Sequence, residues 1–275
     1  MNQVLIFILF LAVSLVCSTL LYTWLRHKTK IAIRYLYLDN PVAAALSAVI
    51  AYGVYRLQSS PGYLLPGVLL IACVGGIAFL ITMIRFWRTP RRKVTAGPGQ
   101  VVSPADGNII YIKELIYDEC PVALKQHRFS KLEELVKTPL LNGHGLHIGI
   151  NMTPFDVHKN CAPISGKIIL NRHFSGKFFS LKNFRSQTEN ERNTYIIRNE
   201  EMEVGVVQIA SRLVRRIDSY VKTGDEVSQG EWIGMIRFGS QVDIILPAGY
   251  RPSVRIGEQV YAAKTILAEK DEDTD

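Results

Sequence analysis

The sequence has little cysteine, and the spacing of that cysteine excludes two common structural uses. Only four cysteines occur in 275 residues, at positions 17, 73, 120 and 161, and none forms a C-x-x-C pair. Two of them lie in apolar runs. This pattern predicts neither a disulfide framework nor a zinc site, and we expect a protein without a bound metal.

Charged residues are also scarce and unevenly distributed. They make up 20% of the chain against 48% hydrophobic residues, and nearly all of the hydrophobic excess precedes Arg85. A simple soluble globule is therefore excluded. Disorder is excluded as well, because long low-complexity tracts are absent and aromatic and β-branched residues are plentiful. The net charge of +8 favours an anionic partner.

Two uncharged runs are long enough to cross a bilayer. Val4–Trp24 has 21 residues and Tyr63–Ile84 has 22, and at 1.5 Å per residue each covers about 30 Å of hydrocarbon. Asn40–Tyr55 has only 16 uncharged residues, which suits a thin or tilted crossing or an interfacial helix. Whether residues 36–58 span the membrane stays open. A cleaved signal peptide is disfavoured, because the first residues carry no basic side chain and no A-x-A site follows.

Basic residues follow the first and the last of these runs, and such clusters favour the cytoplasmic side. Three crossings place both clusters on that side, whereas two would leave the first cluster outside. We therefore expect a membrane anchor of two to three helices over residues 1–93, with three favoured, and a cytoplasmic domain over 94–275. The second cluster could also hold this domain against anionic headgroups, at about 1 kcal/mol per basic residue. The clusters are Arg26, Lys28, Lys30 and Arg34, and Arg85, Arg88, Arg91, Arg92 and Lys93.

From Gly97 onward the sequence consists of short β-rich runs separated by Gly, Pro, Asn and Asp. This pattern predicts an antiparallel, mostly β domain. Leu124–Lys137 has weak helical spacing within a longer connection. The strands are expected at Gln100–Ser103, Asn108–Glu114, Leu146–Met152, Gly166–Leu170, Thr194–Arg198 and Val204–Ile209.

An internal repeat with a period of 33 residues lies near the C-terminus. Val221-x-x-Gly224-Asp-Glu-Val227, followed by Gly230-x-x-Ile233, is echoed by Val254-x-x-Gly257-Glu-Gln-Val260, followed by Thr265-Ile266. Each unit predicts a strand, a glycine-centred turn and a second strand. Such units resemble those of lipoyl- and biotinyl-type carrier domains, so we expect a flattened barrel or sandwich with hairpin repeats. The glycines alone are explained by architecture.

Four short strings carry the chemistry. Taken singly, each has a structural explanation: Asp106 before a glycine is typical of a turn, His158 suits a buried structural histidine, and Gly239-Ser240 suits another turn. The strings are Ser103-Pro104-Ala105-Asp106-Gly107, Phe155-Asp156-Val157-His158-Lys159-Asn160, Ala162-Pro163-Ile164-Ser165-Gly166 and Arg237-Phe238-Gly239-Ser240-Gln241-Val242-Asp243.

In this order, in a β-rich domain behind apolar runs, the strings resemble the phosphatidylserine decarboxylase family, in particular its short archaeal-type branch. The resemblance covers roughly Thr82 to Pro247, and Gly234–Ser240 is its most specific part. It implies a pyruvoyl enzyme that makes its own cofactor by cutting the Gly239–Ser240 peptide bond with the Ser240 hydroxyl. An N-to-O acyl shift gives an ester, elimination gives dehydroalanine, and hydrolysis leaves a ketone. Glycine at 239 admits a distorted approach of the backbone.

The resemblance further implies a large chain, Met1 to Gly239, paired with a small chain, 240–275, that begins with pyruvoyl. A serine hydroxyl is a poor nucleophile without a base, and the family's motifs place Asp106 and His158 beside Ser240 as its partners. Members of the longer bacterial type have a second histidine where this chain has Cys161. Whether His158 acts in self-cleavage, in decarboxylation or in both therefore stays open.

The implied substrate is phosphatidylserine or a closely related serine-headgroup lipid, held in the membrane, and the implied product is the ethanolamine lipid. The substrate amine forms a Schiff base with the ketone, the neighbouring carbonyl accepts electrons as CO2 leaves, and His158 is the candidate to return a proton. No nucleic-acid partner is expected, and a homo-oligomer stays open.

Two histidines, one aspartate and the acidic C-terminal end lie outside the assigned roles, and two other functions were considered. His144 and His147 are expected to be structural or to contact the headgroup, Asp243 to be a strand residue or to position the cleavage site, and the acidic end to be a solvated tail. A membrane adaptor with lipoyl-like repeats is disfavoured because no long heptad hairpin occurs. An uncleaved lipid-binding relative is disfavoured by Gly239-Ser240 but is kept open by Cys161.

Overall fold

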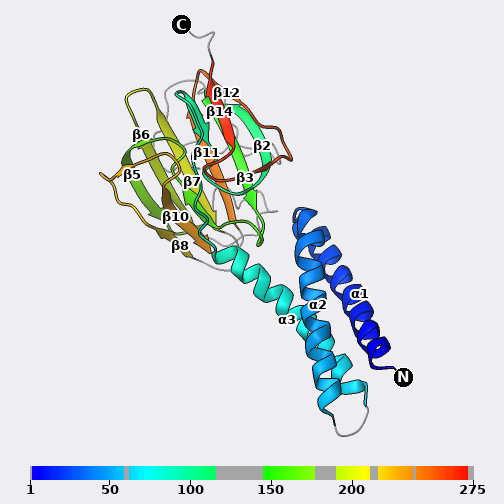
Figure 1. Ribbon diagram of the computed structural model, residues 1–275. Coiled ribbons are helices and arrows are strands. Elements are labelled where there is room, and N and C mark those ends of the chain that lie inside the picture. Colours follow the sequence, from blue (N-terminus) through cyan, green and yellow to red (C-terminus); the bar gives the residue numbers. More distant parts are fainter. Residues whose placement is uncertain are drawn as a thin grey trace, which may run out of the picture. The chain divides into compact units, whose positions relative to one another are not determined.

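The computed structural model describes residues 2–58, 62–115, 145–176, 190–210, 216–237 and 240–271 (Figure 1). Contacts within the chain define two compact units. The first consists of Met1–Arg88 with Thr153–Phe155 and is helical, and the second consists of Thr89–Met152 with Asp156–Asp275 and is built from strands. Leu124–Lys137, the segment with weak helical spacing, lies outside the described residues.

Three helices form the first unit: α1 (Gln3–Thr29), α2 (Arg34–Leu57) and α3 (Leu64–Trp87). The side chain of Asn2 caps α1 by accepting a hydrogen bond from the Val4 amide at 3.1 Å. By length and apolar composition, α1 and α3 are able to cross a membrane, and α2 does not meet the same criterion. The two long apolar runs of the sequence therefore form the two helices that suit a bilayer.

The composition of α2 follows from its packing against α1. From Ala43 to Ala51 its buried residues are small and let two helix backbones approach closely, which lowers the hydropathy of the helix. Two serines of α1 donate across this interface, Ser14 to the Ala44 carbonyl at 2.7 Å and Ser18 to the Asn40 carbonyl at 3.2 Å. The buried small residues of α2 are Ala43, Ala44, Ser47, Ala48 and Ala51.

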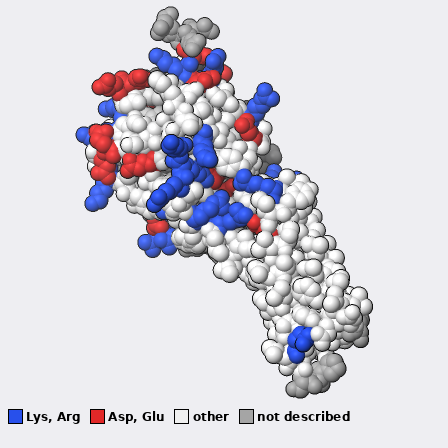
Figure 2. Space-filling model, in the orientation of Figure 1, with Lys and Arg blue, Asp and Glu red and all other residues white. Residues whose placement is uncertain are grey.

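An ion pair joins α2 to α3. The guanidinium of Arg85 donates from Nε to Asp39 Oδ2 at 2.7 Å and from Nη2 to Asp39 Oδ1. Asp39 is buried, so the arginine supplies the counter-charge that a buried carboxylate requires. The remaining surface of the helices is apolar and exposed, and Figure 2 shows that the visible face of this unit is almost free of charged side chains along most of its length.

The described strands of the second unit form three antiparallel sheets. One has eight strands in the order β13-β2-β3-β11-β7-β6-β5-β9, and the other two have the orders β1-β14-β12 and β4-β10-β8. All six sequence-predicted strands are confirmed. The bounds are β1 Gln100–Val102, β2 Gly107–Leu115, β3 Gly145–Met152, β4 Lys159–Cys161, β5 Gly166–Phe174, β6 Arg192–Arg198, β7 Glu203–Ala210, β8 Arg216–Ser219, β9 Glu226–Val227, β10 Trp232–Arg237, β11 Ser240–Pro247, β12 Tyr250–Pro252, β13 Gln259–Val260 and β14 Ile266–Lys270.

The sheet orders show that the second unit is built from two similar halves. Reversing the eight-stranded order exchanges β13 with β9, β2 with β5, β3 with β6 and β11 with β7, and the two three-stranded sheets correspond in the same way. Equivalent hydrogen bonds recur, since Gly257 N donates to Ile109 O and Gly224 N to Ile168 O, both at 2.7 Å. The 33-residue repeat is therefore the C-terminal part of a larger internal duplication.

The predicted lipoyl-like barrel is not confirmed, because the described strands form open sheets and no closed barrel. The reason lies in where the repeat units pair. Each glycine-centred turn delivers its short strand, β9 or β13, to an opposite outer edge of the eight-stranded sheet, and the centre of that sheet is the pair β11–β7. The two halves thus share one broad sheet instead of each closing on itself.

One face of the broad sheet supplies the main hydrophobic core. Alternate residues of a strand point to opposite faces, so Val242 and Ile244 of β11 join the core together with Ile148 and Ile150 of β3. All four side chains are fully buried. The alternating positions Gln241 and Asp243 therefore lie on the other face, where a polar cluster is found.

Candidate active site

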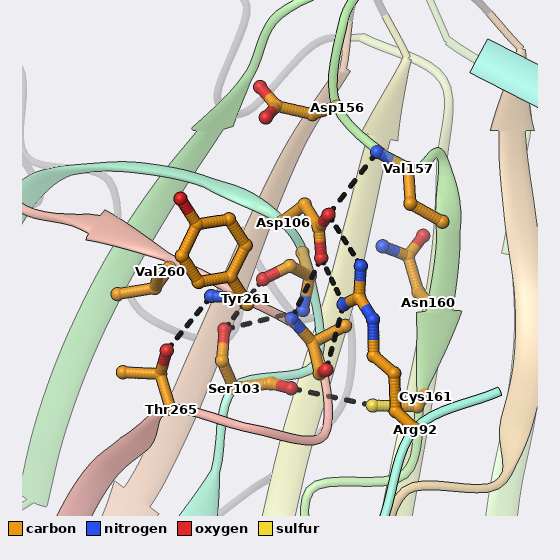
Figure 3. Close-up of polar contacts among 12 residues, drawn as sticks. Arg92, Ser103, Asp106, Asp156, Val157, Asn160, Cys161, Val260, Tyr261 and Thr265 are labelled. Carbon is orange, nitrogen blue, oxygen red and sulfur yellow. Dashed lines mark hydrogen bonds and ion pairs between the residues drawn. The ribbon is translucent and has the colours of Figure 1, made fainter. Parts of the chain in front are cut away.

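Asp106 lies in the turn between β1 and β2, and its buried carboxylate is a hub of hydrogen bonds (Figure 3). Within the described residues, four N–H groups donate to it. Arg92 donates through both terminal nitrogens, with Nη2 2.8 Å from Oδ2, and the amide of Ala262 donates to Oδ1 at 2.8 Å. The amide of Val157 donates to Oδ2 at 3.4 Å. These contacts use the acceptor positions that a carboxylate offers.

The glycine after Asp106 is required by a close approach of two strands. A Cβ atom at Gly107 would lie 2.4 Å from the carbonyl oxygen of Asn151 on β3. The equivalent Gly166 in the other half has the same relation to Arg198, also at 2.4 Å. The glycines of both strings, S-P-A-D-G and A-P-I-S-G, are therefore architectural, as their local pattern indicated.

The residue before each glycine distinguishes the two halves. Ser165 takes the place of Asp106 in the second half, and its hydroxyl accepts a hydrogen bond from the Gln229 amide at 2.9 Å, as Asp106 accepts from Ala262. Gln229 and Ala262 are separated by the same 33 residues as the repeat. A serine hydroxyl is therefore a sufficient hydrogen-bond acceptor for this turn. The turn at Asp106 does not require a carboxylate.

His158 is fully buried just before β4. Its Nδ1 lies 3.0 Å from the main-chain oxygen of Asp156. Because a carbonyl oxygen only accepts, Nδ1 carries a proton, and the basic lone pair of a neutral ring is then on Nε2. The carbonyl of His158 accepts a hydrogen bond from Ile236 N at 3.1 Å, which ties this residue to β10.

Ser240 is the first residue of β11, the strand at the centre of the broad sheet. Its backbone pairs with Met152 of β3 on one side and with Ala210 of β7 on the other. Phe238 and Gly239 lie outside the described residues, so the predicted cleavage bond is located by its C-terminal partner alone. β10 ends at Arg237, so the chain passes from a three-stranded sheet to the broad sheet at this bond.

The main chain brings the sequence-predicted residues to one region. Asp106 binds the amide of Val157, the residue before His158, and His158 binds Ile236, four residues before Ser240. Ser240 in turn pairs with Met152, the last residue of β3, and the chain from Met152 returns to His158. One carboxylate–amide contact and two main-chain contacts therefore link three strings that are far apart in the sequence.

Cys161, the position where a second histidine was considered, has a structural environment. Its side chain is fully buried, and Sγ lies 3.4 Å from the carbonyl of Ser103 in the turn that carries Asp106. Burial raises the pKa of the thiol to about 12. A thiol with this pKa is neither a thiolate nucleophile nor a proton acceptor at neutral pH, so Cys161 does not replace an imidazole.

This environment predicts that Cys161 resists alkylation in the folded protein. Thiol reagents attack the thiolate, and with a pKa of about 12 the thiolate fraction stays very small up to pH 9. Peptide mass spectrometry after iodoacetamide treatment at pH 7 and pH 9 should find Cys161 unmodified, and modified after denaturation. Rapid labelling of the native protein that increases between these two pH values would contradict the buried position.

A second buried polar cluster lies on the other face of the broad sheet. Tyr111 of β2 donates to Asp243 Oδ2 at 2.7 Å, and His147 Nε2 lies 3.1 Å from the same oxygen. Gln241 donates to Asp243 Oδ1 at 2.8 Å and to the Tyr111 hydroxyl at 3.0 Å. Burial and the Asp243 charge raise the pKa of Tyr111 well above its ordinary value, so its hydroxyl stays a donor.

Gly149 makes this cluster possible. A Cβ atom there would lie 2.4 Å from Cζ of Tyr111, so only a glycine leaves room for the ring to pass from β2 across β3 to Asp243 on β11. The cluster fixes β11 three residues after Ser240. His147 and Asp243, which the sequence singled out without a definite role, thus belong to one network, whereas His144 lies outside the described residues.

Arg92 is the residue of this region that the sequence interpretation missed. It was placed with the basic residues that set membrane topology, yet its side chain is 9% exposed and lies on Asp106. Burial alone would lower the pKa of Arg92, but the hydrogen bond and charge of Asp106 outweigh it and raise this pKa. The neighbouring Arg91 and Lys93 are exposed. Because all three residues of this run are basic, the sequence alone does not distinguish the middle one.

The described residues contain no group of three or more His, Cys, Asp or Glu side chains placed to hold a metal ion. The expectation of a metal-free site stays a prediction. What this part of the chain offers is a buried imidazole with a defined protonated nitrogen, a carboxylate that holds backbone amides, and a serine at a strand start. Such an arrangement suits proton transfer and chemistry at a serine.

The comparisons with known proteins agree on a family. The family described as phosphatidylserine decarboxylase matches residues 79–268. Proteins named phosphatidylserine decarboxylase proenzyme from Burkholderia ambifaria and Burkholderia lata are 37% and 38% identical to this chain over 209 residues. Each alignment covers 73% of this chain and 88% of the relative. The matched region includes all four strings and excludes most of the helical unit.

Proposed function

The chain belongs to the phosphatidylserine decarboxylase family, and we propose that it converts phosphatidylserine to phosphatidylethanolamine with a pyruvoyl group made from its own Ser240. The observation that carries the proposal is the arrangement around the cleavage bond. The Asp106 carboxylate accepts from the Val157 amide beside His158, the His158 carbonyl accepts from Ile236 N, and Ser240 pairs with Met152 of β3. The assignment to the short archaeal-type branch stays a prediction.

Self-cleavage is assigned to the Gly239–Ser240 bond. The Ser240 oxygen attacks the Gly239 carbonyl carbon, the C–N bond breaks, and an ester replaces the amide. Loss of the Ser240 α-proton then expels the Gly239 carboxylate and leaves dehydroalanine at position 240. Water hydrolyses its imine tautomer, ammonia departs, and a ketone remains. The relatives' description as proenzymes agrees with such maturation in those proteins.

His158 is the residue to which we assign the proton transfers. With Nδ1 donating to Asp156 O, a neutral ring offers Nε2 as the base for the serine hydroxyl, and the protonated ring is the acid that returns a proton to the product carbon. Asp106 is assigned a positioning role, because its carboxylate already accepts from Arg92 and from two amides. It fixes the backbone that carries His158.

The strand pairing fits a pyruvoyl group at position 240. After cleavage, β11 would begin the small chain 240–275 and remain between β3 and β7 of the large chain. β13 and β14 likewise pair with large-chain strands, β2 and β1. The group supplies a ketone that binds the substrate amine and takes up the electron pair released when CO2 leaves. The chain's own contribution is to hold the new terminus in place.

Membrane attachment suits a substrate with two acyl chains, which stays in the bilayer. We propose that α1, α2 and α3 all cross, with the small residues of α2 packed on α1, and that the β unit is cytoplasmic. The chain would then bring its site to the lipid. The oligomeric state is not part of this proposal, and phosphatidylserine is the only partner it requires besides the membrane.

The test is a paired measurement on the full-length protein purified in detergent. Denaturing electrophoresis is expected to separate chains 1–239 and 240–275, and vesicles containing phosphatidylserine should yield CO2 and phosphatidylethanolamine in equal amounts. An uncut 30.9 kDa chain that forms no product would refute the proposed function, as an uncleaved lipid-binding relative predicts. The adaptor alternative predicts the same negative result and is disfavoured by the family match.

A further inference from the structure

The segment that follows α3 contributes a side chain to the candidate active site. Arg92 lies five residues after Trp87, the last residue of α3, within a run of basic residues. Its guanidinium faces away from solvent and binds both oxygens of Asp106, while Nη1 also donates to the carbonyl of Ala262 at 2.8 Å (Figure 3). Asp106 itself is 1% exposed.

This contact has a fork geometry that only arginine provides. Two nitrogens of one planar group bind two oxygens of one carboxylate, which fixes the orientation of the carboxylate as well as its charge. With that orientation, Oδ2 accepts from Val157 N and Oδ1 from Ala262 N. Val157 precedes His158, so the position of the imidazole depends on how the Asp106 carboxylate is turned.

The corresponding place in the other half of the duplication supports a special role. There Ser165 makes the equivalent turn contact with Gln229 N at 2.9 Å, and the turn is formed without a carboxylate. The Asp106–Arg92 pair is therefore not a requirement of the fold at this position. Burying two charges costs desolvation energy. A turn that forms equally well with serine does not need a buried ion pair.

We propose that Arg92 is a positioning residue for self-cleavage, and that the Gly239–Ser240 bond is cut only when the segment after α3 is docked on Asp106. The inference rests on the proposed function. It divides the basic cluster into two kinds of residue: Arg91 and Lys93 are exposed and available to a membrane surface, and Arg92 belongs to the catalytic region. The membrane anchor and the maturation step are thereby connected through one side chain.

The experiment follows cleavage of newly synthesised full-length protein in membranes, with the fraction cut at successive times read by denaturing electrophoresis. Arg92→Gln is expected to slow cleavage by at least about tenfold, since it removes the charge and the fork from a buried carboxylate. Arg91→Gln is the matched control, one residue away and exposed, and should cleave at the wild-type rate.

Arg92→Lys separates positioning from charge balance. Lysine keeps the positive charge, so the thermal unfolding midpoint in detergent should stay close to that of the wild type, but an ammonium group does not bind both oxygens as a fork. Cleavage is expected to be slowed by about threefold or more, a smaller effect than that of Arg92→Gln. Wild-type cleavage in folded Arg92→Lys would overturn the positioning role, whatever the folding of Arg92→Gln.

Failure of this inference differs from failure of the proposed function. If the wild-type chain is never cut, the proposed function is wrong and Arg92 has nothing to position. If the wild type is cut and folded Arg92→Lys is cut at the same rate as Arg91→Gln, the proposed function stands and the role of Arg92 is refuted.

Discussion

Replacing Ser240 by alanine is expected to leave a single 30.9 kDa chain and to reduce decarboxylation of phosphatidylserine to the uncatalysed background. Alanine preserves the main-chain pairing of β11 with Met152 and Ala210, so the sheet should fold normally. Without the hydroxyl there is no acyl shift, and without the shift no ketone forms to accept the substrate amine. Electrophoresis and CO2 release measure both losses on one preparation.

Ser253→Ala is the matched control for this experiment. Ser253 lies in the same predicted small chain and is exposed, and the hydrogen bond that is described for it, to Leu267 O at 2.8 Å, uses its amide, which alanine retains. This variant should be cut and active like the wild type. A Ser240→Ala protein that still separates into two chains would show that another residue performs the cleavage.

Substitution of His158 by glutamine is expected to have the second largest effect. Glutamine is polar and of similar length but does not exchange a proton near neutral pH, so every step in which His158 acts as acid or base should be slowed by about 10²–10⁴-fold. Cleavage of newly synthesised protein and CO2 release per cleaved chain are measured separately. Loss of the first, the second or both identifies the steps that use the imidazole.

His173→Gln serves as the control, because its side chain lies in β5, is 44% exposed and pairs with the Glu191 carboxylate at 3.3 Å, not with Asp106 or His158. It should change both rates by less than about twofold, as expected for a surface substitution. If His158→Gln is folded and both of its rates equal those of His173→Gln, the proton-transfer role is refuted. The self-cleavage would then depend on Asp106 and on the backbone alone.

The strands were predictable from sequence, whereas their arrangement was not. Alternating β-rich runs such as Leu146–Met152 and Val204–Ile209 specify a strand locally. The order of strands depends on contacts between distant segments, for example β11 between β3 and β7. The repeat at Val221 and Val254 revealed only the C-terminal part of the duplication, because the N-terminal parts of the two halves share a fold and little sequence beyond the two P-x-x-G strings.

The four site residues predicted from the sequence all came from strings that resemble a family, and the structure adds the contacts of Asp106, His158 and Ser240. The Asp106 carboxylate is linked to His158 through the Val157 amide, and a contact to a main-chain group cannot be predicted from the identity of the residue that carries it. Arg92 escaped notice because burial, not composition, distinguishes it from Arg91. Gly239 lies outside the described residues, so its role rests on the sequence alone.

Hydropathy alone did not predict all three helices of the first unit equally well. Hydropathy identified the helices α1 and α3, whose apolar side chains face outward. It was ambiguous for α2, because a helix that packs small residues against a neighbour needs less hydrophobic surface. The ion pair between buried Asp39 and Arg85 also lies where a count of charged residues alone would end a membrane segment. Packing partners, and not the run length of 16 residues, explain this helix.

The most direct test of the central claim is the mass of the small chain from wild-type protein. The account predicts a fragment spanning 240–275 that lacks a free amino terminus and is lighter by one ammonia than the same peptide beginning with serine. Reduction with borohydride should add two hydrogens to its first residue. A fragment that begins with an intact serine, or an uncut chain that nevertheless releases CO2 from phosphatidylserine, would contradict the account.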